Sequence, residues 1–544
     1  MKMKTVMRFS VSLFLYLAIL NANAQIDGGV DIVHEIELDL PEATRNFEKI
    51  KTEIITSPSK VEPYTLQEVD LNLPYLPTKM KPAKMPPDAL KKLYGNNFKI
   101  GAGNYGTSYA EVYLNSKRSD KGYYGARLRH FASQAGPVER NLSRSSENLV
   151  SLFGKYYLDG VTLKGDINYT RFRHNFYGAR QDTLEHLSDI TQVFNIFNVQ
   201  AGVESTNKNA DFVYDLNFNY FNFSDRFKAK ESEYLTDINA AYKLNNEARI
   251  DVGAVLSFST RKDSNSTDRT FFLIKPGYSL NKGRLRGRAG INVAYTNDTV
   301  YNSGVHLYPN VRVEYDVIER TVVAFASLEG EMQKNTLRQF AMQNPWIDSN
   351  VVLAHTNKPL ELMFGAKGNL IEKLNYKARL AYQTFKNLHF FNNAATDTSR
   401  FEILYDNGTS TVLNFGANLS YDVTNKFLVE LRADYYSYTL SKIEKPWHRP
   451  DFSSSILTRY KLDEKIIINA EFYYISGLMG KNPVSGKVTK LDPITDLNLR
   501  AEYRFSPAFS AYLQLNNIFA KKYQHYLYYP VKGINVLAGL TYQF

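Results

Sequence analysis

The chain has 544 residues, a formal net charge of +11 and no cysteine. The lack of cysteine excludes a disulfide framework, a thiol nucleophile and a lipoprotein anchor. The chain contains 39 Tyr and 33 Phe but only 2 Trp, and no apolar run reaches the roughly 18 residues of a membrane-spanning helix.

The N-terminus has the pattern of an export signal. Lys2, Lys4 and Arg8 precede the apolar stretch FSVSLFLYLAIL, and Ala22-Asn23-Ala24 follows as an A-x-A cleavage site. The apolar core is too short for a transmembrane helix, so the pattern predicts a secretory signal peptide over residues 1–24. We expect the mature protein to leave the cytoplasm.

Residues 25–96 form a compositionally distinct segment that is rich in proline. Proline at this density opposes both long helices and strand pairing, which predicts a mostly extended, irregular segment. Only DIVHEIELDL alternates well enough to form a strand. Acidic residues dominate the part up to Asp70, and lysines dominate the part from Lys79 to Lys92.

From residue 97 onward, apolar and polar residues alternate in segment after segment. Three clear cases are VTLKGDINYT (161–170), FVYDLNFNY (212–220) and RLRGRAGINVAY (284–295). Period-two alternation predicts strands with two different faces. Segments of about 10 residues suit tilted strands that cross a bilayer, with lipid on one face and a wet lumen on the other. Because open sheet edges are not tolerated in lipid, residues 97–544 are predicted to form a closed transmembrane antiparallel β-barrel.

The connections between these segments are of two kinds. Short, turn-like links are predicted at 158–160, 207–210, 245–248, 281–283, 318–320, 371–373, 423–426, 462–465 and 506–508. Longer links are predicted at 173–190, 333–358, 386–411, 476–495 and 517–533. Short turns on one side and long loops on the other are typical of outer-membrane barrels, and the short turns should face the periplasm.

The stretch GAGNYG (101–106) matches the G-x-G-x-x-G nucleotide-binding pattern letter for letter. A dinucleotide site requires a following helix, whereas this stretch continues into the alternating SYAEVYLN. A hairpin turn at Asn104-Tyr105-Gly106 explains the glycines and brings the barrel to an even total of about 22 strands.

The predicted inward face carries charges of both signs. These residues are Arg284, Arg286, Arg288, Arg312, Arg432, Arg459 and Arg500, with Asp215, Asp237, Asp251, Glu314, Glu430, Asp434 and Glu502. One interpretation is a network of cross-strand ion pairs that stiffens the wall. The other is that Arg284, Arg286 and Arg288, successive on one face, form a basic stripe that guides anions or holds a partner segment.

The C-terminal stretch NNIFAKKYQHYLYYPVKGINVLAGLTYQF resembles the last hairpin of TonB-dependent receptor barrels. The matching residues are Asn517, Ile518, Phe519, Lys522, Tyr523, Pro530, Gly533 and Phe544. NPW (344–346) is similar to part of an extracellular loop of that superfamily. The resemblance implies a 22-strand outer-membrane barrel in which the terminal Phe544 helps the barrel assembly machinery to recognise the last strand.

The resemblance covers residues 98–544 and fails before them. Family members that pump substrates carry a plug domain larger than the Pro-rich segment. The lead-in PAKM…LYGNNFKIGAGNYGTSYAEVYLN resembles that of plugless barrels of this kind. The acidic part of 25–96 is a candidate to occupy the lumen in place of a plug, or alternatively to bind another protein in the periplasm.

Catalytic and metal-binding patterns are weak. The 9 histidines are scattered, and neither G-x-S-x-G nor H-E-x-x-H occurs. A barrel-embedded hydrolase would need a loop histidine, for which His174, His186, His389 and His448 are candidates. DSNSTD (263–268) lacks the Gly and closing Glu of a calcium loop, which favours an ordinary solvated loop. We therefore expect neither an enzyme nor a cofactor.

Together these patterns predict an outer-membrane barrel of a Gram-negative bacterium, for passage or binding of a solute or partner. The first alternative is a structural or assembly component of an envelope complex, and the second is a barrel-embedded hydrolase. Expected partners are outer-membrane lipid and lipopolysaccharide and the barrel assembly machinery. A periplasmic or lipoprotein partner is a further candidate, and nucleic acid is not expected.

Overall fold

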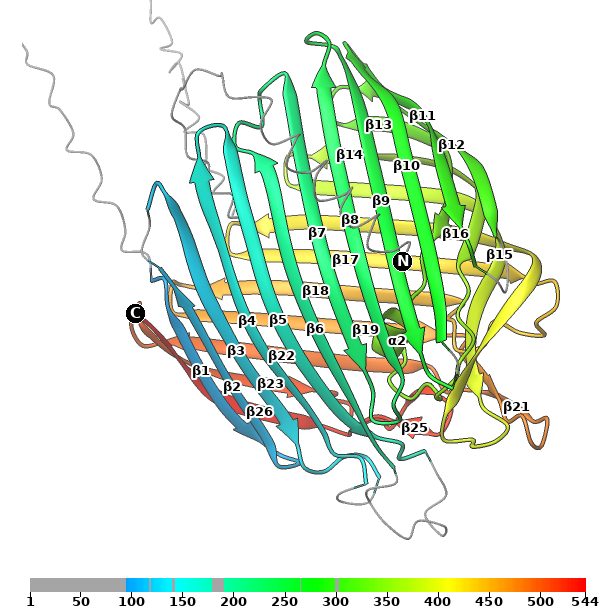
Figure 1. The fold of residues 1–544 in the computed structure, drawn as a ribbon. Helices are drawn as coiled ribbons and strands as arrows, with labels where there is room; N and C mark the ends of the chain where they lie inside the picture. Colours follow the sequence, from blue (N-terminus) through cyan, green and yellow to red (C-terminus); the bar gives the residue numbers. More distant parts are fainter. Residues whose placement is uncertain (1–93, 117–118, 139–141, 179–189, 265, 299–302) are drawn as a thin grey trace, which may run out of the picture. The chain divides into compact units, whose positions relative to one another are not determined.

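The computed structural model describes residues 94–116, 119–138, 142–178, 190–264, 266–298 and 303–544. Within these ranges the chain forms one antiparallel sheet of 22 strands, drawn in Figure 1, in which the first strand pairs with both the second and the last. The sheet is therefore closed, and the predicted fold class and strand number are confirmed. The predicted signal peptide and the Pro-rich segment up to residue 93 lie outside the described residues.

The first half of the barrel consists of long strands that follow one another around the wall. They are β1 (Asn97–Gly103), β2 (Thr107–Asn115), β3 (Gly122–Ser133), β4 (Ser145–Leu158), β5 (Val161–Asn175), β6 (Thr191–Ser205), β7 (Phe212–Ser224), β8 (Lys230–Lys243), β9 (Ala248–Lys262), β10 (Ser266–Lys282) and β11 (Leu285–Thr296).

The second half continues in the same up-and-down order. Its strands are β12 (Gly304–Ile318), β13 (Val322–Gln333), β14 (Thr356–Ile371), β15 (Leu374–Asn393), β16 (Phe401–Thr424), β17 (Phe427–Thr439), β18 (Phe452–Leu462), β19 (Ile466–Ser476), β22 (Ile494–Arg504), β23 (Phe509–Asn516) and β26 (Asn535–Gln543). Shorter elements lie in the connections, namely α2 (Leu337–Gln343), β20 (Met479–Lys481), β21 (Val488–Lys490), β24 (Gln524–Tyr526) and β25 (Tyr529–Pro530).

The seam between β1 and β26 is built around a pair of glycines. Gly101 lies opposite Gly539, and the Tyr512 side chain of β23 covers both, with its hydroxyl donating to the Ile100 carbonyl at 3.1 Å. A Cβ at either glycine would lie 2.4 Å from the Tyr512 hydroxyl oxygen. The absence of a side chain at these positions lets the tyrosine lie across the closing strands.

The two faces of each strand meet different surroundings. On β11, Ile291 is 52% exposed on the outer face, while the neighbouring Asn292 is buried at 4% on the inner face. An outer surface rich in exposed Leu, Ile, Val, Phe and Tyr is the lipid-facing band of a membrane barrel. No helix in the described part of the chain is long and apolar enough to cross a membrane.

The predicted hairpin at Asn104-Tyr105-Gly106 is present between β1 and β2. Tyr105 and Gly106 have φ angles of +57° and +59°, the left-handed values that a two-residue turn of type I′ requires. This turn supplies the extra strand that makes the total even. The nine predicted short links all fall at strand-to-strand turns, at one end of the barrel.

One predicted loop is wrong in extent. Residues 386–411 were expected to form a long connection, but β15 runs to Asn393 and β16 starts at Phe401, so the connection is only 394–400. A β-bulge at Asn387, with φ of +55°, interrupts the register without ending the ladder. Period-two alternation is broken by the bulge, which is why the sequence pattern concealed the strands. The resulting long hairpin is clear in Figure 1.

The outer face of β11 provides a test of which side of the wall meets lipid. Ile291→Lys should lower the free energy of unfolding by about 2–4 kcal/mol, because an ammonium near the bilayer midplane is poorly solvated. The inward-facing control Asn239→Lys should have little effect, since Asn239 lies beside Asp237 on the lumen wall. Urea unfolding in lipid vesicles measures both, and equal losses in the two variants would contradict this assignment of faces.

Candidate functional site

The inner face of the barrel is polar and carries charges of both signs at facing positions. Lysine and arginine side chains reach carboxylates on neighbouring or next-neighbouring strands at 2.7–3.1 Å, in the pairs Arg127–Glu111, Lys155–Glu204, Lys164–Asp215, Lys367–Glu314 and Arg379–Asp434. Each such partly exposed pair stabilises the wall by at most about 1 kcal/mol. Together these pairs make the lumen wall polar, which favours polar solutes over apolar ones.

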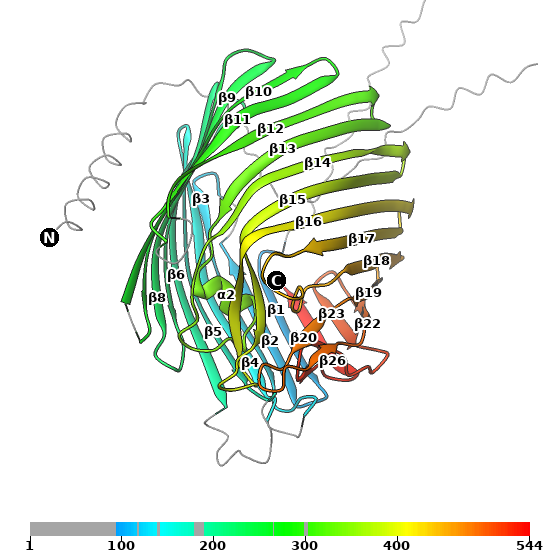
Figure 2. The same ribbon diagram turned by 90° about the vertical axis from the view of Figure 1, so that its right-hand side faces the viewer.

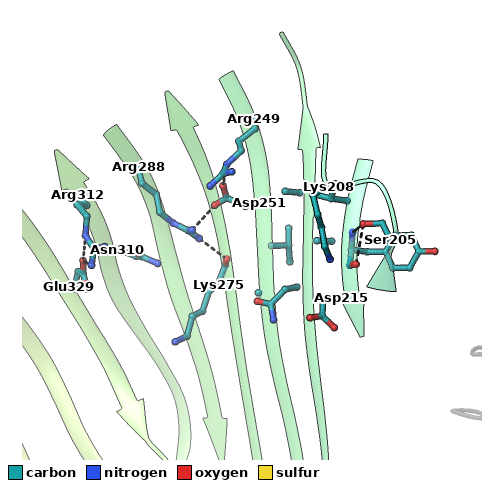
Figure 3. Close-up of a pocket in the computed structure, with 17 residues that line it drawn as sticks. Ser205, Lys208, Asp215, Arg249, Asp251, Lys275, Arg288, Asn310, Arg312 and Glu329 are labelled. Atoms are coloured by element: carbon teal, nitrogen blue, oxygen red, sulfur yellow. Dashed lines mark hydrogen bonds and ion pairs between the residues drawn. The ribbon is translucent and has the colours of Figure 1, made fainter. Parts of the chain in front are cut away.

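A cavity of about 420 Å³ opens on this wall between β6 and β13, and Figure 3 shows its lining. Asp251 stands at its centre and is bridged by Arg288 at 2.7 Å and by Arg249 at 3.1 Å. Arg312 pairs with Glu329 at 2.8 Å on the same surface. We refer to this recess as the mixed-charge cavity. Its lining offers several donors and acceptors at once, which matches a polar solute better than a simple ion.

The structure places the three arginines of the predicted basic stripe in different environments. Arg286 makes a two-pronged ion pair with Asp316 at 2.7 and 2.8 Å. Arg288 pairs with Asp251, as described above. Arg284 is exposed in the turn that precedes β11. Two of the three therefore have acidic partners, the geometry of a cross-strand network, and a role of the stripe in guiding anions stays a prediction.

Three connections at the long-loop end, residues 334–355, 440–451 and 517–534, fold inward and contact one another (Figure 2). We call them the lid. In Figure 2 the lid helix α2 lies inside the ring of strands. The Tyr526 hydroxyl donates to the Gln343 carbonyl at 3.0 Å, and the Leu527 N–H donates to the His448 ring at 3.1 Å. These bonds join all three connections to one another.

Helix α2 is held on the barrel wall by a buried carboxylate. Glu231 of β8, 3% exposed, accepts hydrogen bonds from the Leu337 and Arg338 backbone N–H groups, each at 3.0 Å. These are first-turn N–H groups, which have no partner within a helix. Thr336 forms a capping box with Gln339 at the same end. The helix start is thus satisfied jointly by its own sequence and by the wall.

Three further polar anchors fasten the lid to the strands. Glu233, next but one to Glu231, forms an ion pair with Lys334 and accepts a hydrogen bond from Ser257. Arg269 of β10 donates to the Asn335 carbonyl at 2.8 Å. On the opposite side, Asp406 of β16 accepts the backbone N–H groups of residues 441–443. Buried charged groups with this many partners fix position, because leaving any of them unpaired is costly.

An aromatic cluster forms the interior of the lid. The Trp346 ring stacks on Tyr529 with a centroid distance of 4.0 Å, and Tyr177 and Phe401 pack edge-on or tilted against Tyr529. Tyr529 is 1% exposed and its hydroxyl donates to the Ser399 carbonyl. The NPW motif and the C-terminal P-x-x-G stretch, recognised separately in the sequence, therefore meet here.

The loop histidines considered as catalytic candidates are buried in structural contacts. His174 hydrogen-bonds the Pro345 carbonyl, and His389 packs against Phe340. His448 donates from Nδ1 to the Phe391 carbonyl and accepts at Nε2 from Leu527. Burial lowers the pKa of His448 to about 4, so its ring is neutral at pH 7. His186 lies outside the described residues.

The remaining sequence motifs serve local structure. Asn517, with φ of +49°, donates to the Lys521 and Lys532 carbonyls and so closes its loop. Phe544 exchanges backbone hydrogen bonds with Asn96, and its role as an assembly signal stays a prediction. In DSNSTD, Asp263 pairs with Arg261. Among the residues that the structure describes, no three His, Asp or Glu side chains converge as metal ligands would.

No protein-family model and no curated protein matches the chain. Solved structures do match its fold. The FrpB iron transporter of Neisseria meningitidis aligns over 84% of this chain and 82% of its own, with 12% identity and a TM-score of 0.65. The siderophore receptor PirA of Acinetobacter baumannii aligns over 82% and 80%, with 10% identity and a TM-score of 0.65.

The ferric-catecholate import receptor Fiu of E. coli K12 aligns over 83% and 82% of the two chains, with 11% identity and a TM-score of 0.62. At these identities the likeness shows the fold alone. It confirms the expected fold, a 22-strand barrel like those of the iron transporter and the siderophore receptors. A lipid-facing closed barrel of this kind is an outer-membrane protein of a Gram-negative bacterium. The expected lack of a plug concerns residues outside the described ranges.

Sequence patterns did not identify the wall residues that anchor the lid. Glu231, Glu233 and Arg269 look like ordinary inward charges on alternating strands, and their partners lie 66–107 residues further along the chain. The one available signal was the NPW motif, which marked the loop as special but not its contacts.

The role of Glu231 is testable by substitution. Glu231→Ala leaves two buried N–H groups of α2 without acceptors, which should destabilise the closed lid by about 1–3 kcal/mol per lost group. We expect faster hydrogen exchange over residues 334–347 and faster trypsin cleavage after Arg338. The control Glu247→Ala, in an exposed turn at the other end, should leave both unchanged. Unaltered exchange in Glu231→Ala would contradict the anchor.

Acidification should loosen the lid through His448. Its pKa is about 4 in the folded protein against an ordinary value of 6.5, so unfolding the lid takes up a proton between these pH values. The contribution of His448 to lid stability is therefore full above pH 6.5 and falls toward pH 4, by up to about 1.4 kcal/mol per pH unit.

The chain has only two Trp, Trp346 and Trp447, and both lie in the lid, so their fluorescence reports lid unfolding in urea. The urea midpoint should drop between pH 7 and pH 5. His448→Gln, whose amide can keep both hydrogen bonds without titrating, should reduce this dependence; the rest comes from His355 and His525 of the lid, whose pKa values burial also lowers. An identical pH dependence in the variant would show that His448 is not responsible.

Proposed function

We propose that this protein is an outer-membrane receptor-like barrel that binds a polar solute in its lumen and passes it across the membrane. The single observation that carries the proposal is the combination of a charged lumen wall with a lid folded into the mouth. A wall that recognises polar solutes, behind a movable barrier, is the arrangement that selective passage requires.

The mixed-charge cavity supports a polar solute of mixed or zwitterionic character. Asp251 of β9, Arg288 of β11 and Arg312 of β12 present both signs within one recess of about 420 Å³. The fold neighbours are named as iron transporters and siderophore receptors, which supports solute handling as the general role. Their substrates are not transferred to this chain.

A second candidate function is a docking platform, in which the lid stays closed and the outer surface or an attached segment binds a partner. The packing of the lid favours it: Phe340, Phe401 and Tyr529 are each no more than 2% exposed, as in the core of a globular domain. A barrier packed this tightly is stable without a ligand. Residues 25–96 would then serve as the periplasmic adaptor.

We propose no enzymatic activity. The buried positions of His174, His389 and His448 support this, since a general base must reach its substrate. Each of the three packs on aromatic rings or bonds to backbone groups. A hydrolase would be revealed by a hydrolytic activity that is lost when one of these three histidines is substituted.

Passage is tested by planar-bilayer conductance of the full-length protein. The double variant Glu231→Ala/Trp346→Ala removes one polar anchor and one aromatic contact of the lid, and should raise single-channel conductance several-fold over the wild type. Glu247→Ala is the control for general damage, and heat-modifiable migration on gels verifies that each barrel is folded. Deleting residues 25–92 in the same background tests whether that segment also obstructs the lumen.

The outcome separates the two candidate functions. Raised conductance in the lid variant, together with uptake of charged sugars or amino acids into proteoliposomes, supports passage. Conductance that stays at the wild-type level in both the lid variant and the deletion variant contradicts it. A stoichiometric partner that copurifies from native membranes, and is lost when residues 25–92 are deleted, would instead support the docking platform.

A further inference from the structure

A second cavity, of about 370 Å³, lies between β17 and the lid. Tyr436 and Tyr438 of β17 line it from the wall, and Trp447, His525 and Tyr526 line it from the lid. We call it the aromatic cavity. Its size falls within the range of sites for small molecules, and its walls offer flat rings with a few polar edges, the usual lining of such sites.

The only charged side chain that lines the aromatic cavity is Arg449. Its Nη2 donates to the His389 carbonyl at 2.7 Å, and its guanidinium lies over the Phe390 ring at 5.0 Å from the centroid. These two contacts hold the group in place. In the part of the chain that the structure describes, the guanidinium has no other hydrogen bond and no carboxylate within ion-pair distance.

The other ionisable groups of the cavity do not balance this charge. Burial lowers the pKa of both His448 and His525, so these rings are neutral at pH 7. Asp451, two residues further on, accepts a hydrogen bond from Ser476 and does not reach Arg449. The cavity therefore carries one uncompensated positive charge, and burial accordingly lowers the pKa of Arg449.

This arrangement differs from that of two inward arginines on the barrel wall. Arg286 is matched by Asp316, and Arg379 is matched by Asp434, each at 2.7 Å. Burying a guanidinium without an acidic partner costs free energy, and a bound anion that pairs with it would offset this cost. Since a guanidinium presents paired donors in one plane, a carboxylate is a well-matched completing group.

We propose that the aromatic cavity binds a small ring compound that carries a carboxylate. The ring lies against the tyrosine and tryptophan side chains, and the carboxylate accepts hydrogen bonds from Arg449. An aromatic acid and a sugar acid share this chemistry. The site is distinct from the mixed-charge cavity and does not depend on whether a solute passes through the lumen.

The test is isothermal titration of the purified full-length protein in detergent with benzoate and with glucuronate. Each is compared with its neutral counterpart, benzamide or glucose. We expect saturable binding of at least one acid, at least tenfold tighter than its counterpart, which corresponds to about 1.4 kcal/mol. Binding of benzoate alone identifies an aromatic acid, and binding of glucuronate alone identifies a sugar acid.

Substitutions assign the binding to Arg449. Arg449→Gln should weaken binding of the acid at least tenfold and abolish its advantage over the neutral compound, while Arg449→Lys should retain part of it. The matched control is Arg432→Gln, on the inner face of the same strand as Tyr436 but outside the cavity, which should bind as the wild type does. Quenching of tryptophan fluorescence by the bound acid gives an independent readout, because Trp447 lines the cavity.

The proposal is overturned if neither acid binds saturably, if the neutral compounds bind equally well, or if a folded Arg449→Gln binds the acid as tightly as the wild type. Heat-modifiable migration and circular dichroism confirm that each variant is folded. None of these results bears on the conductance experiment, so this site and the passage proposal fail or stand separately.

Discussion

The structure depends on one constraint: in a lipid bilayer every backbone N–H and C=O must find a partner within the protein. A flat sheet cannot meet it, because its two edge strands would each leave a row of unpaired groups in hydrocarbon. Pairing of β1 with β26 removes both edges. The alternating sequence, the even number of strands and the glycine pair beneath Tyr512 all serve that closure.

Closure creates a second problem, because a cylinder of this width surrounds a water-filled space that side chains of the wall cannot fill. At the long-loop end, the three lid segments fold inward into this space. Their interior is as apolar as a protein core, yet their attachment to the wall is polar, through Glu231, Glu233, Arg269 and Asp406. Apolar packing gives the lid its cohesion, and the buried charges fix where it sits.

How much of this could be predicted from the sequence follows from the range of the interactions. Strand alternation and turn chemistry are local, so VTLKGDINYT and Asn104-Tyr105-Gly106 revealed the wall and its parity directly. The contact of Trp346 with Tyr529 joins residues far apart in the sequence, and neither residue's neighbours indicate the other. Arg449 could not be distinguished from other loop arginines in the sequence. What sets it apart is that no carboxylate of the described residues pairs with it, and this depends on the tertiary structure. The sequence did not predict the extension of β15 and β16, because the bulge at Asn387 interrupts the period-two alternation of apolar and polar residues.

The extended hairpin has a mechanical consequence. Beyond the bulge at Asn387, residues 388–393 and 401–406 form a two-stranded ladder, and Phe401 also bridges to Ile347 of the lid. An isolated two-stranded ribbon is marginally stable in water, so this one depends on the lid segment that packs against it. The same ribbon supplies the His389 carbonyl and the Phe390 ring that support Arg449, and the Asp406 carboxylate that holds residues 441–443. Bending of the ribbon would therefore move the carbonyl and the ring that hold the Arg449 guanidinium, which couples the position of this one charge to the shape of the ribbon.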